Sequence, residues 1–180
     1  GNLIFSSAIF DIERRNVPFE TPDNRVEQRG AQRHKGAEAA LTGLIGNISI
    51  TGSLSVLDAE ITEDDNPSLV GNTPVAVPDF TAAIWAEYQF EGDWSGLSLQ
   101  AGWRYEDERP IDPANTFNHE AFHKVDIGAK YEQLIAVRSS LVYRLSVSNV
   151  SDETYYKSRS LSDVNLEAPR LIRASVEYVF

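Results

Sequence analysis

The sequence predicts an all-β protein of the antiparallel transmembrane β-barrel class, and three observations support this prediction. Apolar and polar residues alternate along most of the chain with a period of two, which is typical of strands with two unlike faces. The connections between the alternating segments are short and long in turn. Aromatic residues gather near the segment ends, where membrane barrels carry aromatic girdles.

The alternation is clearest in the last segment, where Ile172, Ala174 and Val176 alternate with polar residues such as Arg173 and Glu177. We expect about eight strands, most of them near the 9–11 residues that a tilted membrane strand needs. They are residues 3–12, 36–44, 48–56, 81–90, 97–106, 124–131, 141–148 and 171–180. The first two have the weaker pattern.

The expected connections fall into two classes. Residues 43–47, 91–96 and 132–138 are tight, whereas residues 14–35, 62–79, 107–122 and 151–168 are long and polar. Short turns on one rim and long loops on the other are typical of outer-membrane barrels. An antiparallel sheet with one solvated face would explain the alternation, but neither the loop asymmetry nor the aromatic placement.

The two faces of the expected sheet differ in chemistry. The apolar face carries Tyr88, Phe90, Trp103, Tyr105, Tyr131, Tyr143, Tyr178 and Phe180. The opposite face carries charges that a dry core would not accept unpaired, so we expect it to line a wet or protein-filled lumen. The candidate lumen-lining and substrate-binding residues are Trp85, Glu87, Arg104, Glu106, Lys124, Asp126, Arg144 and Arg173.

Composition excludes several classes of function. The chain has 27 acidic and 16 basic residues, so its net charge of −11 argues against nucleic acid as a partner. It has no cysteine, which excludes disulfides and cysteine-based zinc sites. It has no methionine and begins at Gly1 inside an apolar stretch, so we expect a fragment whose natural N-terminus is missing. No apolar run approaches the roughly 18 residues of a membrane helix.

Residues 119–123 match the zinc-protease pattern H-E-x-x-H. Two histidines four apart share one zinc on a helix, but they lie about 13 Å apart on a strand. Here His123 leads into an alternating segment, so we expect extended chain, and a zinc hydrolase using His119, Glu120 and His123 is a minor alternative. Acidic residues 63–65 could suggest calcium, but they favour a solvated loop tip.

Several stretches, taken in order, resemble the C-terminal barrel portion of TonB-dependent siderophore receptors. They are FDIERRNV (10–17), RGAQRHKGAEAALTG (29–43), GNTPVAVPDFTAAIWAEYQF (71–90), HKVDIGAKY (123–131), LSVSNVSDETYY (145–156) and APRLIRASVEYVF (168–180). Ala37, Ser151 and Glu167 depart from the usual pattern and leave the ligand undetermined. Tyr155 and Tyr156 in the fifth stretch could face a ligand, although they fit the rim of a loop better.

The resemblance implies that residues 1–180 are about the last eight strands of a barrel of about 22 strands, without its plug domain and TonB box. It implies an outer-membrane receptor for ferric siderophores, energised through TonB, and neither an enzyme nor a cofactor protein. The chain would supply four extracellular loops. Its expected partners are the ferric siderophore, TonB, its own plug domain, outer-membrane lipid and the barrel assembly machinery, with Phe180 as the assembly signal. The alternative is a self-contained eight-stranded outer-membrane barrel with a structural or adhesive role.

Overall fold

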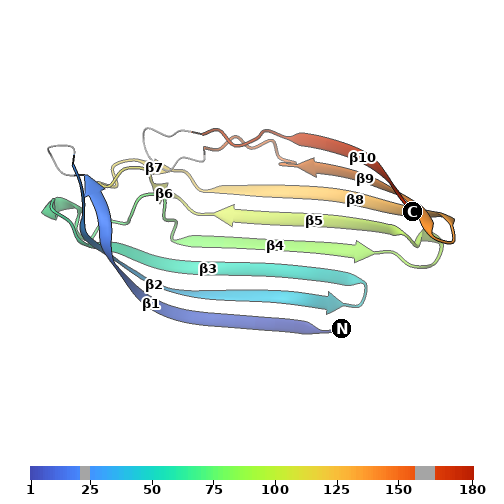
Figure 1. The fold of residues 1–180 in the computed structure, drawn as a ribbon, viewed down its shortest axis with the longest axis horizontal. Coiled ribbons are helices and arrows are strands. Elements are labelled where there is room, and N and C mark those ends of the chain that lie inside the picture. The colour runs from blue at the N-terminus through green and yellow to red at the C-terminus, as the bar shows by residue number, and fades with distance from the viewer. Residues whose placement is uncertain (21–24, 157–164) are drawn as a thin grey trace.

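The main body of the computed structural model is one antiparallel sheet of eight strands, and the structure describes residues 1–20, 25–156 and 165–180. The strands are β1 (Leu3–Glu20), β2 (Val26–Ile45), β3 (Ile48–Glu63), β4 (Phe80–Gln89), β5 (Leu97–Glu106), β8 (Phe122–Ala136), β9 (Ser139–Ser148) and β10 (Leu171–Val179). They lie side by side in that order (Figure 1). The predicted all-β, antiparallel class is confirmed.

Four smaller elements lie in the connections. The 3₁₀ turns η1 (Pro67–Leu69) and η2 (Gly92–Trp94) follow β3 and β4, and the strands β6 (Arg109–Pro110) and β7 (Asn118–His119) form a small two-stranded sheet between β5 and β8. No helix in the described part of the chain is long and apolar enough to cross a membrane.

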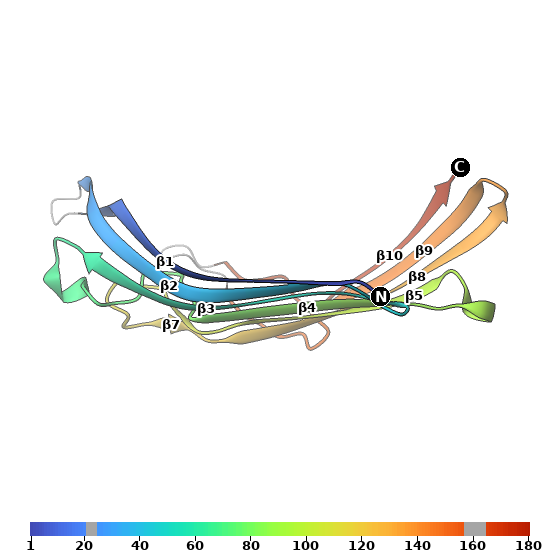
Figure 2. The same ribbon diagram turned by 90° about the horizontal axis from the view of Figure 1, so that it is seen from below.

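The sheet is curved and its two edges do not meet. Figure 2 shows the bend, and both termini lie at the end that carries the short turns (Figure 1). Within the described ranges, β1 pairs with β2 alone and β10 pairs with β9 alone. A self-contained eight-stranded barrel would need these edges to pair, because open edges are not tolerated in lipid. The observed topology therefore disfavours that alternative.

The connections alternate in length as expected, with two corrections. Residues 46–47, 90–96 and 137–138 are short, whereas residues 64–79, 107–121 and 149–170 are long. The prediction of a long loop at residues 14–35 was wrong, since β1 runs to Glu20 and β2 begins at Val26. The turn predicted at 132–138 is also shorter, because β8 continues to Ala136. Residues 157–164 of the predicted loop 151–168 lie outside the described residues.

The continuation of β1 and β2 was missed because the alternation stops there while the backbone pairing goes on. On one face Glu13 lies opposite Arg33, and on the other face Arg14 lies opposite Gln32. Arg33 donates two hydrogen bonds to Asp11, at 2.8 and 2.5 Å. When both faces of a strand are polar, the period-two signal disappears although the strand remains.

The register places the apolar residues of neighbouring strands on one face. One row across the sheet runs through Ile50, Ala86, Ala101, Ile127, Val147 and Ile172. Large hydrophobic residues on this face are exposed, for example Ile172 at 65%. Because soluble proteins rarely expose an apolar surface of this extent, the face requires a covering layer.

Aromatic residues mark both ends of the apolar face. Near the long loops, Tyr105 packs against Phe80 and Trp103, with ring centroids 5.8 and 6.1 Å away. Near the short turns, Tyr131 stacks on Tyr143 at 6.3 Å. The apolar stretch between the two groups spans about eight residues, or about 27 Å measured along a strand. At the tilt of roughly 40° that is typical of membrane barrels, this is about 20 Å of height, somewhat less than the roughly 25 Å of their apolar band.

Candidate functional site

Two hollows on the polar face contain most of the predicted lumen-lining residues. The first, of about 250 Å³, is lined by Trp85, Arg104, Lys124 and Asp126 on β4, β5 and β8. Trp85 lies over Gly102, its register partner on β5, and a Cβ atom at that glycine would collide with the indole ring. The missing side chain of Gly102 therefore makes room for the tryptophan.

The second hollow, of about 610 Å³, lies nearer the short turns. Glu87, Arg144 and Arg173 line it, from β4, β9 and β10. Arg144 donates a 2.6 Å hydrogen bond to Glu177, which ties β9 to β10. The hollow therefore brings one acidic and two basic side chains, from distant positions in the sequence, to the same surface.

Glu106, the remaining candidate, lies in neither hollow. Its carboxylate forms an ion pair with Arg109 of β6, and both side chains are largely buried. This pair anchors the start of the 107–121 loop at the end of β5. Glu106 is thus placed to hold a loop rather than to face a solvent-filled space.

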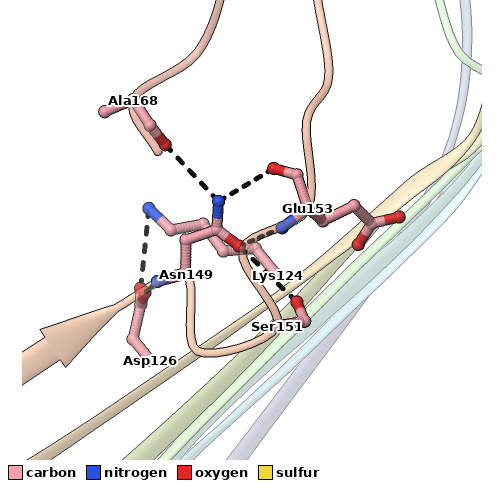
Figure 3. A network of polar contacts seen from close by, with 6 residues as sticks. All are labelled: Lys124, Asp126, Asn149, Ser151, Glu153 and Ala168. Carbon is pink, nitrogen blue, oxygen red and sulfur yellow. Dashed lines mark hydrogen bonds and ion pairs between the residues drawn. The ribbon is translucent and has the colours of Figure 1, made fainter. Parts of the chain in front are cut away.

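A buried asparagine fastens the 149–170 loop to β8 (Figure 3). Asn149, which is 1% exposed, donates its backbone N–H to Asp126 at 2.8 Å. Its side-chain amide donates to the carbonyl oxygens of Glu153 at 2.9 Å and Ala168 at 3.4 Å, and its oxygen accepts the Glu153 N–H at 3.0 Å. Asp126 also lies 3.7 Å from the Lys124 ammonium. Sequence reasoning marked this stretch by resemblance but did not identify its role.

The two tyrosines that follow differ in exposure. Tyr155 is 7% exposed and stacks on Phe122, with ring centroids 4.0 Å apart. Burial raises the pKa of its hydroxyl. The guanidinium group of Arg104 lies over the Phe122 ring, 5.8 Å from its centre. Tyr156 is half exposed and stacks on His119. Tyr155 therefore packs the loop onto the sheet.

The 64–79 and 107–121 loops are joined by reciprocal hydrogen bonds. The Thr73 N–H donates to Asn115 Oδ1 at 2.8 Å, and Asn115 Nδ2 donates to the Thr73 carbonyl oxygen at 2.9 Å. Asn72 Nδ2 donates to the Pro113 carbonyl oxygen at 2.9 Å, and the Ala76 N–H donates to that of Pro110 at 2.8 Å. We call these four contacts the loop clasp. No sequence pattern predicts it, because it joins residues about 40 positions apart.

Next to the clasp lies a larger hollow of about 970 Å³, here called the rim hollow. It is lined by the long-loop ends of β1, β2 and β3, and by both clasped loops. Apolar lining residues include Ile61, Leu69 and Val77, and the acidic residues Glu63, Asp64 and Asp65 line it as well. Glu63 and Asp65 are exposed, as expected for a solvated acidic run, and the run lies at the end of β3 and the start of the 64–79 loop.

The H-E-x-x-H match is not on a helix. His119 belongs to β7 and His123 to β8, and their register partners are Arg109 and Tyr105. The zinc arrangement that the motif requires is therefore absent from this segment. Burial, and then the charge of Arg109, lower the pKa of His119. Across residues 1–20, 25–156 and 165–180, no three His, Asp or Glu side chains are grouped to hold a metal ion.

The last residue, Phe180, follows β10 and is 91% exposed. Its ring lies 5.6 Å from that of Tyr178, so the two aromatic residues share the apolar face at the short-turn end. Together with Tyr131 and Tyr143, they complete the aromatic group at this rim.

Comparisons with known proteins agree with this architecture. The family model described as TonB dependent receptor-like, beta-barrel matches residues 1–150. The Ferrichrome outer membrane transporter/phage receptor of Escherichia coli (strain K12) is 31% identical over 87% of the chain, and the Metal-pseudopaline receptor CntO of Pseudomonas aeruginosa is 28% identical over 91%. The chain spans 21% and 23% of these two proteins.

Solved structures show the same strand arrangement. The ferric preacinetobactin receptor BauA of Acinetobacter baumannii superposes with a TM-score of 0.88 and 25% identity, covering 100% of this chain and 28% of that one. The structure of the unliganded ferric citrate transporter FecA superposes with a TM-score of 0.81 and 20% identity, covering 99% of this chain and 28% of that one. The chain belongs to the TonB-dependent receptor β-barrel family, and its sheet is a section of an outer-membrane barrel wall.

Proposed function

We propose that this chain is the C-terminal part of an outer-membrane transporter that takes up ferric siderophores with energy delivered through TonB. The family membership carries this proposal, since the relatives include proteins named as ferrichrome receptors and structures titled as siderophore receptors. In this proposal the apolar face contacts lipid, the polar face lines the lumen against a plug domain, and the long loops are extracellular.

The polar face fits a wall that hydrogen-bonds to a plug. Its two hollows expose Trp85, Glu87, Lys124 and Arg173 without closing into an enclosed pocket. We infer that these residues, with Arg104, Arg144 and Asp126, contact the plug and passing substrate. Trp85 and Arg104 are the stronger candidates for substrate contact, because they lie nearer the long loops.

Phe180 has a separate proposed role. Its exposed ring, on the apolar face at the short-turn end, suits recognition by the barrel assembly machinery before insertion. This role requires no contact with the cargo.

Deletion and complementation test the transport proposal. A strain that lacks the complete gene containing this chain should grow poorly on a ferric siderophore as the sole iron source, and the gene should restore growth. Growth restored equally well in the absence of TonB would reject the proposed energy coupling. No growth defect on any hydroxamate, catecholate or carboxylate siderophore would reject siderophore uptake itself.

A further inference from the structure

The small sheet of β6 and β7 lies at the long-loop end of the main sheet (Figure 1). Its β7 strand contacts the 149–170 loop, because the imidazole of His119 stacks on Tyr156 with ring centroids 6.2 Å apart and planes inclined by 14°. We call this contact the loop joint. Since histidine is the side chain whose ordinary pKa lies nearest neutrality, the joint contains a group that can change its charge in mild acid.

Tyr156 lies where the two legs of this loop meet. It forms an isolated antiparallel bridge with Leu166, and beside it the Glu167 N–H donates to the Tyr155 carbonyl oxygen at 3.1 Å. Burial, and then the charge of Glu167, raise the pKa of the Tyr155 hydroxyl. The base of the loop is fastened separately, through Asn149. A contact on Tyr156 therefore acts on both legs at once and is independent of the base.

The surroundings of His119 suit its neutral form. Its Nε2 atom is buried and has no hydrogen-bond partner in the part of the chain that the structure describes. Its register partner is Arg109 of β6, whose largely buried side chain is ion-paired with Glu106 at the end of β5. A proton on the ring would place a second positive charge beside Arg109, where a single carboxylate already has a partner. It would also leave a buried, charged N–H without an acceptor.

Other acidic residues near β6, β7 and the 149–170 loop have partners of their own or face solvent. Glu153 lies 3.6 Å from His123 Nδ1, at the base of the loop. Asp107, which precedes β6, accepts the Tyr105 hydroxyl at 3.3 Å. The exposed acids are Glu108 and Glu120.

Protonation of His119 is therefore disfavoured while the joint is closed. Burial, and then the charge of Arg109, lower the pKa of the ring below its ordinary value of about 6.5. Once the joint opens, the ring reaches water and regains the ordinary value. The closed joint is thus fully stable above about pH 6.5, and it loses stability as the pH falls from there through the lowered pKa of the closed joint.

We propose that the loop joint is a pH-sensitive switch, in which a proton on His119 breaks the stack on Tyr156 and frees the 149–170 loop from the 107–121 loop. The loop clasp joins its two loops without a titratable side chain, so it stays closed in the same pH range. The switch goes beyond the proposed transport function, and it requires no particular cargo.

Hydrogen exchange of the complete receptor tests the switch, when it is compared at about pH 7.5 and about pH 5 and corrected for the intrinsic exchange rate. We expect exchange at residues 155–156 and 166–167 to accelerate at least about threefold at the lower pH. Exchange at residues 72–76 of the clasp should change less than about 1.5-fold. Asp112 stays ionised at about pH 5, because hydrogen bonds led by that of the Phe117 N–H hold its pKa below the usual value of about 3.9.

Three variants identify the responding group. His119→Phe keeps an aromatic ring for the stack but cannot take a proton, so it should lose the acceleration. His123→Gln is the matched control, since it removes the histidine at the base of the same loop and should keep the full response. Arg109→Gln keeps both stacked rings and leaves the Glu106 carboxylate to pair with a protonated His119, so acid should no longer open the joint.

The proposal is overturned if the unmodified receptor shows no acceleration, or if His119→Phe accelerates as much as the unmodified receptor. Equal exchange of these two proteins at about pH 7.5 checks that the stack is intact in the variant, and Arg109→Gln tests the charge argument independently of that stack. A response that is lost in His123→Gln would assign the switch to the other histidine and contradict the proposal.

Two further results would contradict it. Exchange that slows in acid would mean that the His119 imidazolium pairs with Glu106 and holds the joint closed. Equal acceleration at residues 72–76 would mean that acid loosens the long loops as a whole, rather than the joint.

Discussion

The carboxylate of Asp126 accepts the backbone N–H of Asn149 at 2.8 Å, so a side chain expected to line the lumen also fastens a long loop to β8. Asn149 has a φ of 55° and is almost fully buried. Its amide spans the base of the 149–170 loop (Figure 3). Asp126 and Asn149 together set where the loop leaves the sheet.

Asn149→Ala is expected to lower the free energy of opening this loop base by about 2–4 kcal/mol. The reason is that it removes several buried hydrogen bonds and places alanine at a positive φ. Hydrogen exchange at residues 150–155 should accelerate. Asn149→Gly is the matched control, since it removes the hydrogen bonds without the strain and should give the smaller effect. Unchanged exchange in Asn149→Ala would contradict the assigned role.

Gly102→Val is expected to displace Trp85, because no side chain at this position fits beneath the indole. In the complete receptor, the part of the tryptophan emission that Trp85→Phe removes should shift to the red in Gly102→Val, because the displaced indole becomes more hydrated. Gly52→Ala on β3 is the control, since a Cβ there meets ordinary contacts at 3.5 Å or more. If Gly102→Val left the emission spectrum unchanged, the position of Trp85 would not depend on the space over Gly102.

The 107–121 loop is expected to loosen in acid through Asp112. Its carboxylate accepts the Phe117 N–H at 2.8 Å and the Thr116 N–H at 3.2 Å, and these bonds, led by Phe117, hold its pKa below the usual value. A lowered pKa contributes stability above the unfolded-state pKa of about 3.9, and this contribution is lost as the pH falls through the folded-state value.

Exchange at residues 116–117 should therefore accelerate at low pH in the unmodified protein, after correction for the intrinsic exchange rate. Asp112→Asn should show faster exchange already at neutral pH and lose most of this pH dependence. If the variant and the unmodified protein responded equally to acid, Asp112 would not be the titrating group.

Phe180→Ser is expected to reduce the amount of folded receptor in the outer membrane several-fold, because it removes the exposed aromatic group proposed for assembly. Val179→Ser, one residue earlier and on the opposite face of the strand, should have little effect. Heat-modifiable migration of outer-membrane fractions measures the folded amount. Equal losses in both variants would point to general weakening of β10 instead.

The sequence patterns predicted the sheet well where its two faces meet unlike surroundings. Residues 97–106 and 171–180 alternate cleanly because one face is apolar, and β5 and β10 fall there within a residue. The pattern failed at residues 14–35, where Arg33 pairs with Asp11 on one face and Arg14 lies opposite Gln32 on the other. There the backbone ladder, rather than side-chain burial, maintains the strands.

The site was harder to predict than the sheet. Polar-face positions such as Trp85 and Arg104 follow from alternation alone, whereas their grouping into hollows depends on the register of neighbouring strands. The contact between Asn115 and Thr73 depends on how two loops fold toward each other. Local sequence patterns carry no information about such long-range contacts.

Uptake of radioactive iron by intact cells tests the central claim most directly. Cells that produce the complete receptor, with the chromosomal copy deleted, are given radiolabelled ferric siderophores with and without functional TonB. We predict saturable, TonB-dependent accumulation of at least one ferric siderophore. Accumulation that is identical with and without the receptor, across hydroxamate, catecholate and carboxylate complexes, would contradict the assignment as a siderophore transporter.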